Sequence, residues 1–233
     1  MSAITIEKYQ KELVDLFHSN GDPSKREAME NYMRNQFSFL GIKSPERKTL
    51  LKGFLVEHGK PEIEWIKQLV TFLYAQPERE FHYAALAMID VHIKELDAEW
   101  LPFVEELIVT NSWWDTVDHL APHHAGAILL RDKKGIVDFP ERWIGSDNFW
   151  LQRSAILFQL KYKGKTDAEK LFSYIEATKA SKEFFVQKGI GWALREYSKT
   201  APEDVLHFIN KTEGLASLSK REGLKHLERM KSC

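Results

Sequence analysis

The feature that most limits how this chain can fold is an internal repeat of about 35 residues. Six segments align: PERKTLL (45–51), EFHYAALAMI (80–89), WWDTVDHLAP (113–122), NFWLQRSAIL (148–157), EFFVQKGIGW (183–192) and LSKREGLKHL (218–227). Their equivalent residues are Thr49, Ala84, Asp118, Arg153, Lys188 and Gly223, in steps of 35, 34, 35, 35 and 35 residues. A period of this length predicts copies of one supersecondary unit stacked side by side.

Each unit is expected to be a pair of helices, because apolar residues recur every three or four positions. In the first segment the apolar face is Ile6, Tyr9, Leu13, Leu16 and Phe17. Further helical stretches at 63–74, 100–109 and 168–179 lie between the aligned segments, and the 12 glycines and 8 prolines are sparse. The chain therefore predicts an all-α fold: six helix pairs and an N-terminal helix forming one domain, 1–233, a curved solenoid with the second helices on its concave side.

Some local boundaries also follow from residue type. Pro122 is expected to interrupt a helix, since proline has no backbone N–H. Ser112 and Asp147 precede aromatic-rich segments and are expected to be N-caps. Trp113 and Trp114 would stand 100° apart on a helix, so we expect one in the core and the other at the surface.

The repeat predicts one functional stripe along the second helices. Asp118, Arg153 and Lys188 are repeat-equivalent, and a step of four residues along the same helix face adds Trp114 and Trp192. The stripe would combine a carboxylate, a guanidinium and two indoles. The simpler alternative is that these tryptophans belong to the core.

Basic residues gather in the same elements and favour a long anionic partner. They are Arg47, Lys48, Lys52, Lys161, Lys163, Lys165, Arg195, Lys199, Lys220 and Arg221. Residues 1–145 hold 17 basic against 23 acidic side chains, whereas 146–233 hold 16 against 11, so the formal net charge of −1 hides a basic C-terminal part. The alternative is that these cations are merely solvated.

Other site classes have little support. The only cysteine is Cys233, so no internal disulfide or cysteine zinc finger is expected, and a cytoplasmic location is the default. No apolar run is long enough for a membrane span, and no phosphate-binding glycine loop or nucleophile elbow occurs. His119, His123 and His124 with Asp115 offer a weak alternative of a metal site, but no metal and no cofactor are expected.

Four segments closely resemble the AlkD family of bacterial alkylpurine DNA glycosylases. They are FLGIKSPERKTLLK (39–52), PFVEELIVTNSWWDTVDHLAP (102–122), WIGSDNFWLQRSAILFQLKYK (143–163) and SKEFFVQKGIGWALREYSKT (181–200). The similarity runs from about Tyr32 to Lys225. It implies a right-handed α-solenoid of HEAT-like repeats with a concave DNA-binding groove, and excision of cationic N3- or N7-alkylated purines, such as 3-methyladenine and 7-methylguanine, from duplex DNA.

The resemblance also implies residue roles. The family's essential acid falls on Asp118, its two cleft tryptophans on Trp114 and Trp192, and its conserved-motif arginine on Arg153. Tyr32 and Lys161 match positions that face DNA. Together with the basic residues, the expected DNA contacts are Tyr32, Arg47, Lys48, Lys161, Lys163, Lys188, Arg195 and Lys199.

Two arrangements of Arg153 stay open from the sequence. It could hold a DNA phosphate by a bidentate contact, or it could pair with Asp118, lower the pKa of that carboxyl and keep it ionised. The expected enzyme is a monomer that releases the base without flipping it and without cleaving the strand. The rival interpretations are a non-catalytic module that binds damaged or branched DNA, and a protein-interaction scaffold.

Overall fold

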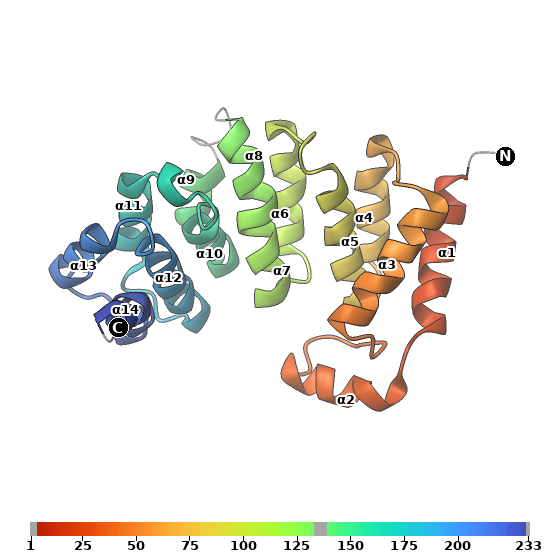
Figure 1. Ribbon diagram of the computed structural model, residues 1–233, viewed down its shortest axis with the longest axis horizontal. Coiled ribbons are helices and arrows are strands. Elements are labelled where there is room, and N and C mark those ends of the chain that lie inside the picture. The colour runs from red at the N-terminus through yellow and green to blue at the C-terminus, as the bar shows by residue number, and fades with distance from the viewer. Residues whose placement is uncertain (1–3, 133–138, 232–233) are drawn as a thin grey trace. The chain divides into compact units, whose positions relative to one another are not determined.

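A computed structural model describes residues 4–132 and 139–231 of the chain, and within these ranges every regular element is helical (Figure 1). Cys233, and with it the expectation about its thiol, lies outside the described residues. The chain divides into two compact units, residues 1–92 and 93–233. In the described ranges no helix is both long and apolar enough to cross a membrane. The predicted all-α class is confirmed.

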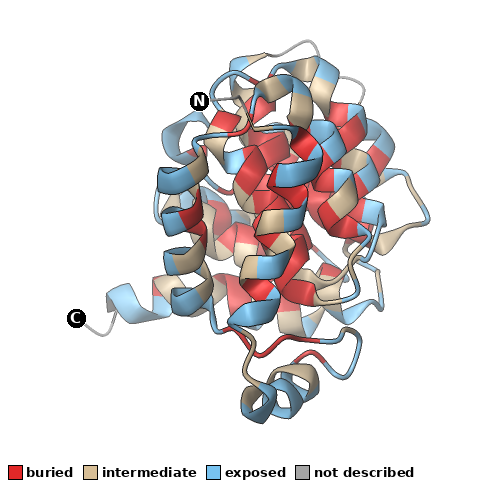
Figure 2. Cartoon of the chain, turned by 90° about the vertical axis from the view of Figure 1, so that its right-hand side faces the viewer, coloured by how far each residue is buried: buried red, intermediate tan, exposed pale blue. Residues whose placement is uncertain are grey.

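The first unit contains five α-helices and one short 3₁₀ turn among its described residues. They are α1 (Ile6–Ser19), α2 (Pro23–Tyr32), α3 (Ser44–His58), η1 (Ile63–Trp65), α4 (Ile66–Tyr74) and α5 (Arg79–His92). Leu13 and Phe17 of α1 are fully buried, and the Phe17 ring stacks on Phe81 of α5 at 5.5 Å. Figure 2 shows buried residues gathered in the interior of the unit and exposed ones on the outer helix sides. The apolar spacing of α1 thus forms its packed face, as expected.

The second unit holds the remaining helices. They are η2 (Ala98–Trp100), α6 (Leu101–Val109), α7 (Trp114–His119), η3 (Leu120–Ala125), α8 (Gly126–Arg131), α9 (Phe139–Ile144), α10 (Phe149–Leu157), η5 (Lys163–Lys165), α11 (Ala168–Thr178), α12 (Phe184–Tyr197), α13 (Pro202–Lys211) and α14 (Ser217–Lys231). Helix α12 packs between α10 and α14, and α9 packs on α10. Their shared core includes Leu157, Ile175, Ile190 and Leu194.

The repeat maps onto the helices as predicted. The six equivalent residues lie in α3, α5, α7, α10, α12 and α14, and the intervening stretches form α4, α6, α9, α11 and α13. Each repeat position therefore falls on the second helix of a pair, which brings Asp118, Arg153 and Lys188 onto successive packed helices of the second unit. The single-domain boundary and the shape of the predicted groove stay predictions.

Three local expectations were wrong. Pro122 does not interrupt its helix: α7, η3 and α8 run on from Trp114 to Arg131, and η3 is a π-helix. A π turn is wider than an α turn, so it accommodates a ring that lacks an N–H. Ser112 donates to the Ile108 carbonyl instead of capping α7, and Asn148, not Asp147, caps α10 through a bond from the Trp150 amide.

Candidate active site and nucleic-acid interface

The centre of the candidate site is an ion pair between Asp118 of α7 and Arg153 of α10. Arg153 Nε donates to Asp118 Oδ1 at 2.8 Å, and Nη2 donates to Oδ2 at 2.9 Å. The Asp118 side chain is 18% exposed, and the Arg153 side chain is 5% exposed. Two parallel bonds between planar groups fix the orientation of the carboxylate more firmly than a single contact would. The pairing with Asp118 that the sequence left open is thus formed in the structure.

A third contact holds Arg153 from the opposite side. Its Nη1 donates to the main-chain carbonyl of Phe185 in the first turn of α12. Gly189, one turn later on α12, leaves the space for the guanidinium, since a Cβ at 189 would lie 3.0 Å from Arg153 Nη1. Because Arg153 is bonded on both sides and buried, it serves as a fixed support for Asp118.

Burial and charge act on the Asp118 carboxyl in opposite directions. Loss of solvent raises its pKa above the ordinary aspartate value, and the neighbouring Asp115 adds to the rise, while the charge and hydrogen bonds of Arg153 pull it down. The net direction is upward. Arg153 does lower this pKa, as expected of the pairing, but the desolvation of the carboxyl outweighs that effect.

The predicted indoles Trp114 and Trp192 are both partly buried. Trp114 opens α7 four residues before Asp118, and Trp192 follows Lys188 by four residues on α12 and packs against the core of the second unit. Trp113 is not in the helix but in extended backbone just before it, so the 100° argument does not apply. It is also partly buried, and the expected split between a core and a surface tryptophan was wrong.

Trp113 instead joins an aromatic cluster at the start of three second helices. Its ring lies 5.9 Å from that of Trp150 and 5.2 Å from that of Phe185, and Trp150 and Phe185 are 4.9 Å apart. Phe149 packs on Trp150 at 4.7 Å. The cluster links the helices that carry Asp118, Arg153 and the Phe185 carbonyl, so it contributes to the rigidity of the ion pair.

Lys188 and Arg195 of α12 meet a residue that sequence reasoning missed, Glu222 of α14. Lys188 Nζ lies 2.9 Å from Glu222 Oε1, and Arg195 Nη1 lies 3.0 Å from Oε2. Lys225 adds a third bond, Nζ to Oε1, at 2.7 Å. A signal was available: Glu222 follows Lys188 by 34 residues, nearly the step that joins Asp118 to Arg153.

The other predicted cations of the second unit are more exposed. Lys199 lies in the turn after α12 and pairs with Glu196 of that helix at 2.6 Å. Lys161 is exposed in the turn after α10, and Lys163 is exposed at the start of the 3₁₀ element η5, with a φ of 53°. Lysines at such a turn can reach a backbone phosphate, so they stay candidates for DNA contacts.

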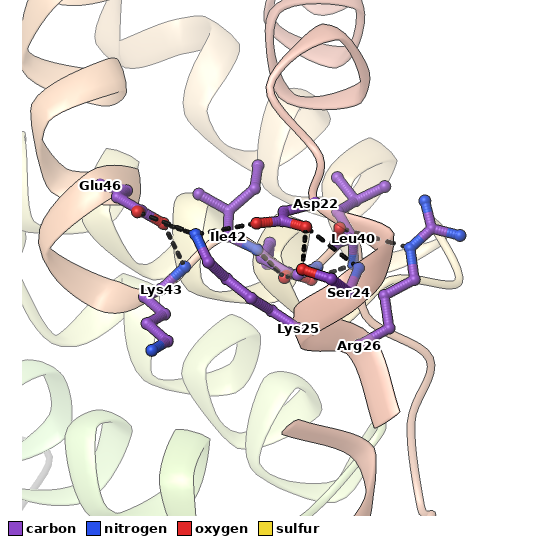
Figure 3. Close-up of polar contacts among 10 residues, drawn as sticks. Asp22, Ser24, Lys25, Arg26, Leu40, Ile42, Lys43 and Glu46 are labelled. Atoms are coloured by element: carbon purple, nitrogen blue, oxygen red, sulfur yellow. Dashed lines mark hydrogen bonds and ion pairs between the residues drawn. The ribbon is translucent and has the colours of Figure 1, made fainter. Parts of the chain in front are cut away.

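The remaining predicted contacts belong to the first unit. Tyr32 is exposed at the end of α2, Lys48 is exposed on α3, and the Arg47 guanidinium lies 4.2 Å from the centroid of the Tyr83 ring. Helix α2 has no buried residue and is held by polar contacts (Figure 3). Lys25 lies 3.1 Å from both Asp22 and Glu46.

The histidines lie together where α7, which ends at His119, continues into the π-helical stretch with His123 and His124. The rings of His119 and His123 stack with centroids 4.7 Å apart and planes 12° apart. The His124 ring lies 4.9 Å from that of His119, and imidazoles are common metal ligands. The alternative of a metal site stays a prediction.

Comparisons with known proteins bear on the family and the fold of the chain. The family model described as "DNA alkylation repair enzyme" matches residues 13–227. A solved structure described as a predicted DNA alkylation repair enzyme from Enterococcus faecalis is 32% identical, with a TM-score of 0.82 over 89% of this chain and 96% of that one. No match was found among curated proteins.

Two more solved structures, both from Streptococcus mutans, are more distant and bear on the fold. AlkD2 is 16% identical, with a TM-score of 0.63 over 97% of this chain and 98% of that one. The protein smu.31 is 15% identical, with a TM-score of 0.62 over 93% and 98%. These likenesses support the predicted α-solenoid class.

Proposed function

The chain belongs to the DNA alkylation repair enzyme family, and from this premise we propose that it is a monofunctional DNA glycosylase. Its substrates would be cationic N3- and N7-alkylated purines in duplex DNA, such as 3-methyladenine and 7-methylguanine. The observation that carries the proposal is the partly buried Asp118 carboxylate, fixed by two bonds from Arg153. A DNA repair role follows from the family, and the ion pair supports the proposed glycosylase chemistry.

The proposed reaction uses the positive charge that alkylation puts on the base. The bond between the base nitrogen and C1′ breaks, and its electron pair leaves with the base, which becomes neutral. The deoxyribose is left with an oxocarbenium-like cation. A carboxylate held in a poorly solvated position stabilises that charge, and it can accept the proton of the water that attacks C1′. The raised pKa of Asp118 strengthens it as this base.

Trp114 and Trp192 would serve the same cation through their ring faces. Indole faces attract positive charge, and both side chains are partly exposed on the helices that carry Asp118 and Lys188. Neutral damaged bases would be poor substrates, because an ionised Asp118 has no proton to give to the leaving base. In the predicted open groove the base could leave without being flipped, which would also admit bulky adducts.

The direct test is base release from methylated duplex DNA under single-turnover conditions. Asp118→Asn keeps the size of the side chain and removes its charge, so we expect the rate to fall about 100-fold or more. Asp204→Asn on the exposed first turn of α13 is the matched control and should keep the wild-type rate. Borohydride should trap no covalent adduct, since no imine is formed.

The rival functions give different results in the same experiment. A non-catalytic module that binds damaged DNA would bind the duplex and release no base, with or without Asp118. A protein-interaction scaffold would show little salt-dependent affinity for DNA, whereas several phosphate contacts make affinity fall steeply with salt. Either result from the wild type would reject the glycosylase assignment.

A further inference from the structure

We infer that Glu222 is a positioning residue that gathers Lys188, Arg195 and Lys225 into one site for a DNA backbone phosphate. The inference deepens the proposed function, because it names the phosphate-holding part of the same second-helix face. It also adds two residues, Glu222 and Lys225, that neither the repeat nor the family resemblance singled out.

The packing of α12 on α14 is shaped to place Glu222 at this point. Gly191 of α12 allows the close approach, since a Cβ there would lie 2.4 Å from Glu222 Cβ and 3.1 Å from the Ser219 carbonyl oxygen. Ser219 Oγ also donates to the Gln187 carbonyl at 2.9 Å, which ties the first turn of α14 to α12. Two contacts between α12 and α14 therefore fix the backbone around Glu222: the close approach at Gly191 and the bond from Ser219.

The Glu222 carboxylate is bonded by more positive charges than are needed to neutralise it. Two ammonium groups share its Oε1 and a guanidinium takes its Oε2, all within 3.0 Å, so three positive charges surround one negative charge. One cation would be enough to neutralise a buried carboxylate. The surplus of two positive charges is the electrostatic condition for binding an anion.

The exposure of the four side chains shows where an anion would bind. Glu222 is 7% exposed, while the three cations are between 33% and 41% exposed. The carboxylate thus lies beneath, and the cations present their remaining N–H donors to solvent. The pKa of Glu222 is lowered to about 2, mainly by the bonds from Lys225 and Lys188, so this carboxyl is ionised at neutral pH.

The position on α12 connects the cluster to the candidate site. Lys188, Trp192 and Arg195 follow one another in steps of four and three residues, so they share one helix face. A phosphate bound between Lys188 and Arg195 would lie along the face that carries the Trp192 indole. Long cationic side chains lose rotamer freedom when they bind, and prior bonding to Glu222 lowers that entropic cost.

The decisive variant is Glu222→Gln, because a net-charge effect and a positioning effect would change the affinity for DNA in opposite directions. It removes one negative charge, so if the cations acted only through net charge, duplex DNA would bind more tightly. If Glu222 positions them, binding weakens by about tenfold and the slope of log K against log salt falls by about 0.9 for the lost phosphate contact. Affinity for an undamaged duplex would be measured by fluorescence anisotropy at several salt concentrations.

Two further variants keep the test interpretable. Glu176→Gln is the matched control: it makes the same charge change where Glu176 pairs with Lys179 at 2.6 Å, and it should not weaken binding. Lys225→Met removes a partly exposed cation and should also weaken binding and lower the salt slope. Thermal melting shows whether each variant is folded. If Glu222→Gln does not fold, the affinity and salt slope of Lys225→Met test the inference.

The inference is overturned if folded Glu222→Gln binds DNA as tightly as the wild type or more tightly, or if folded Lys225→Met keeps the wild-type affinity and slope. These measurements need no base release. A wild type that binds with a steep salt dependence but frees no base would reject the glycosylase proposal alone.

Discussion

Gly189→Ala should damage the candidate active site by adding a single methyl group. The new Cβ would lie 3.0 Å from Arg153 Nη1 and 3.4 Å from its Cγ. Ordinary carbon contacts lie at about 3.5–4.0 Å, so the guanidinium must move by a few tenths of an ångström. It cannot swing aside freely, because it is bonded to Asp118 on one side and to the Phe185 carbonyl on the other.

The size of the effect follows from that displacement. A misplacement of about 1 Å at a catalytic group costs roughly 100-fold in rate, so a shift of a few tenths should cost about tenfold. Stability responds to two opposing effects. Alanine gains about 0.5–1 kcal/mol over glycine inside a helix, while overpacking costs about 1–3 kcal/mol. We expect a net destabilisation of at most about 2.5 kcal/mol.

The assay pairs single-turnover base release with urea denaturation. Gly53→Ala on α3 is the control, because its Cβ would meet no atom within 4 Å. That variant should be stabilised by about 0.5–1 kcal/mol with an unchanged rate. If Gly189→Ala behaved like Gly53→Ala in both measurements, Arg153 would not be tightly held, and the argument that it fixes Asp118 would fail.

Three more predictions concern the carboxyl groups of Asp118 and Glu80. The rate of base release should fall as the pH falls through the raised pKa of Asp118, with a midpoint above the ordinary aspartate value of about 3.9, and a wild-type midpoint below that value would contradict this. Arg153→Gln should move the midpoint higher, because Arg153 lowers the Asp118 pKa, and an unchanged midpoint would contradict this second prediction. Glu80→Ala should destabilise the first unit by about 3 kcal/mol or more in urea, because the Glu80 carboxylate accepts the main-chain N–H groups of residues 40–42 at 3.0 Å. A loss under about 1 kcal/mol would show that water replaces it.

Much of the fold was readable from the sequence, because a repeat is a local property. The apolar spacing and the 35-residue step were enough to place the six second helices and to make Asp118, Arg153 and Lys188 equivalent positions. The same locality explains the errors. Whether Pro122 ends a helix depends on whether the neighbouring turns can widen, and residue type does not specify that.

For the candidate site, too, the sequence identified some features and missed others. Sequence named the aspartate, the arginine and the two indoles, since their types and spacing carry the chemistry. It left open whether Arg153 binds Asp118 or a phosphate, and it missed Glu222, Lys225 and Gly189. These depend on how closely α10, α12 and α14 approach one another, which is set by contacts between residues 27 to 36 positions apart.

The sequence by itself therefore determined the helices, their order and the chemical types on their shared face, because short-range periodicity encodes them. Only the tertiary structure decided the partners of the charged groups and the direction of the Asp118 pKa. That direction is the difference between the desolvation of the carboxyl and its attraction to Arg153, and both depend on burial and distance. Neither is a property of any short stretch of chain.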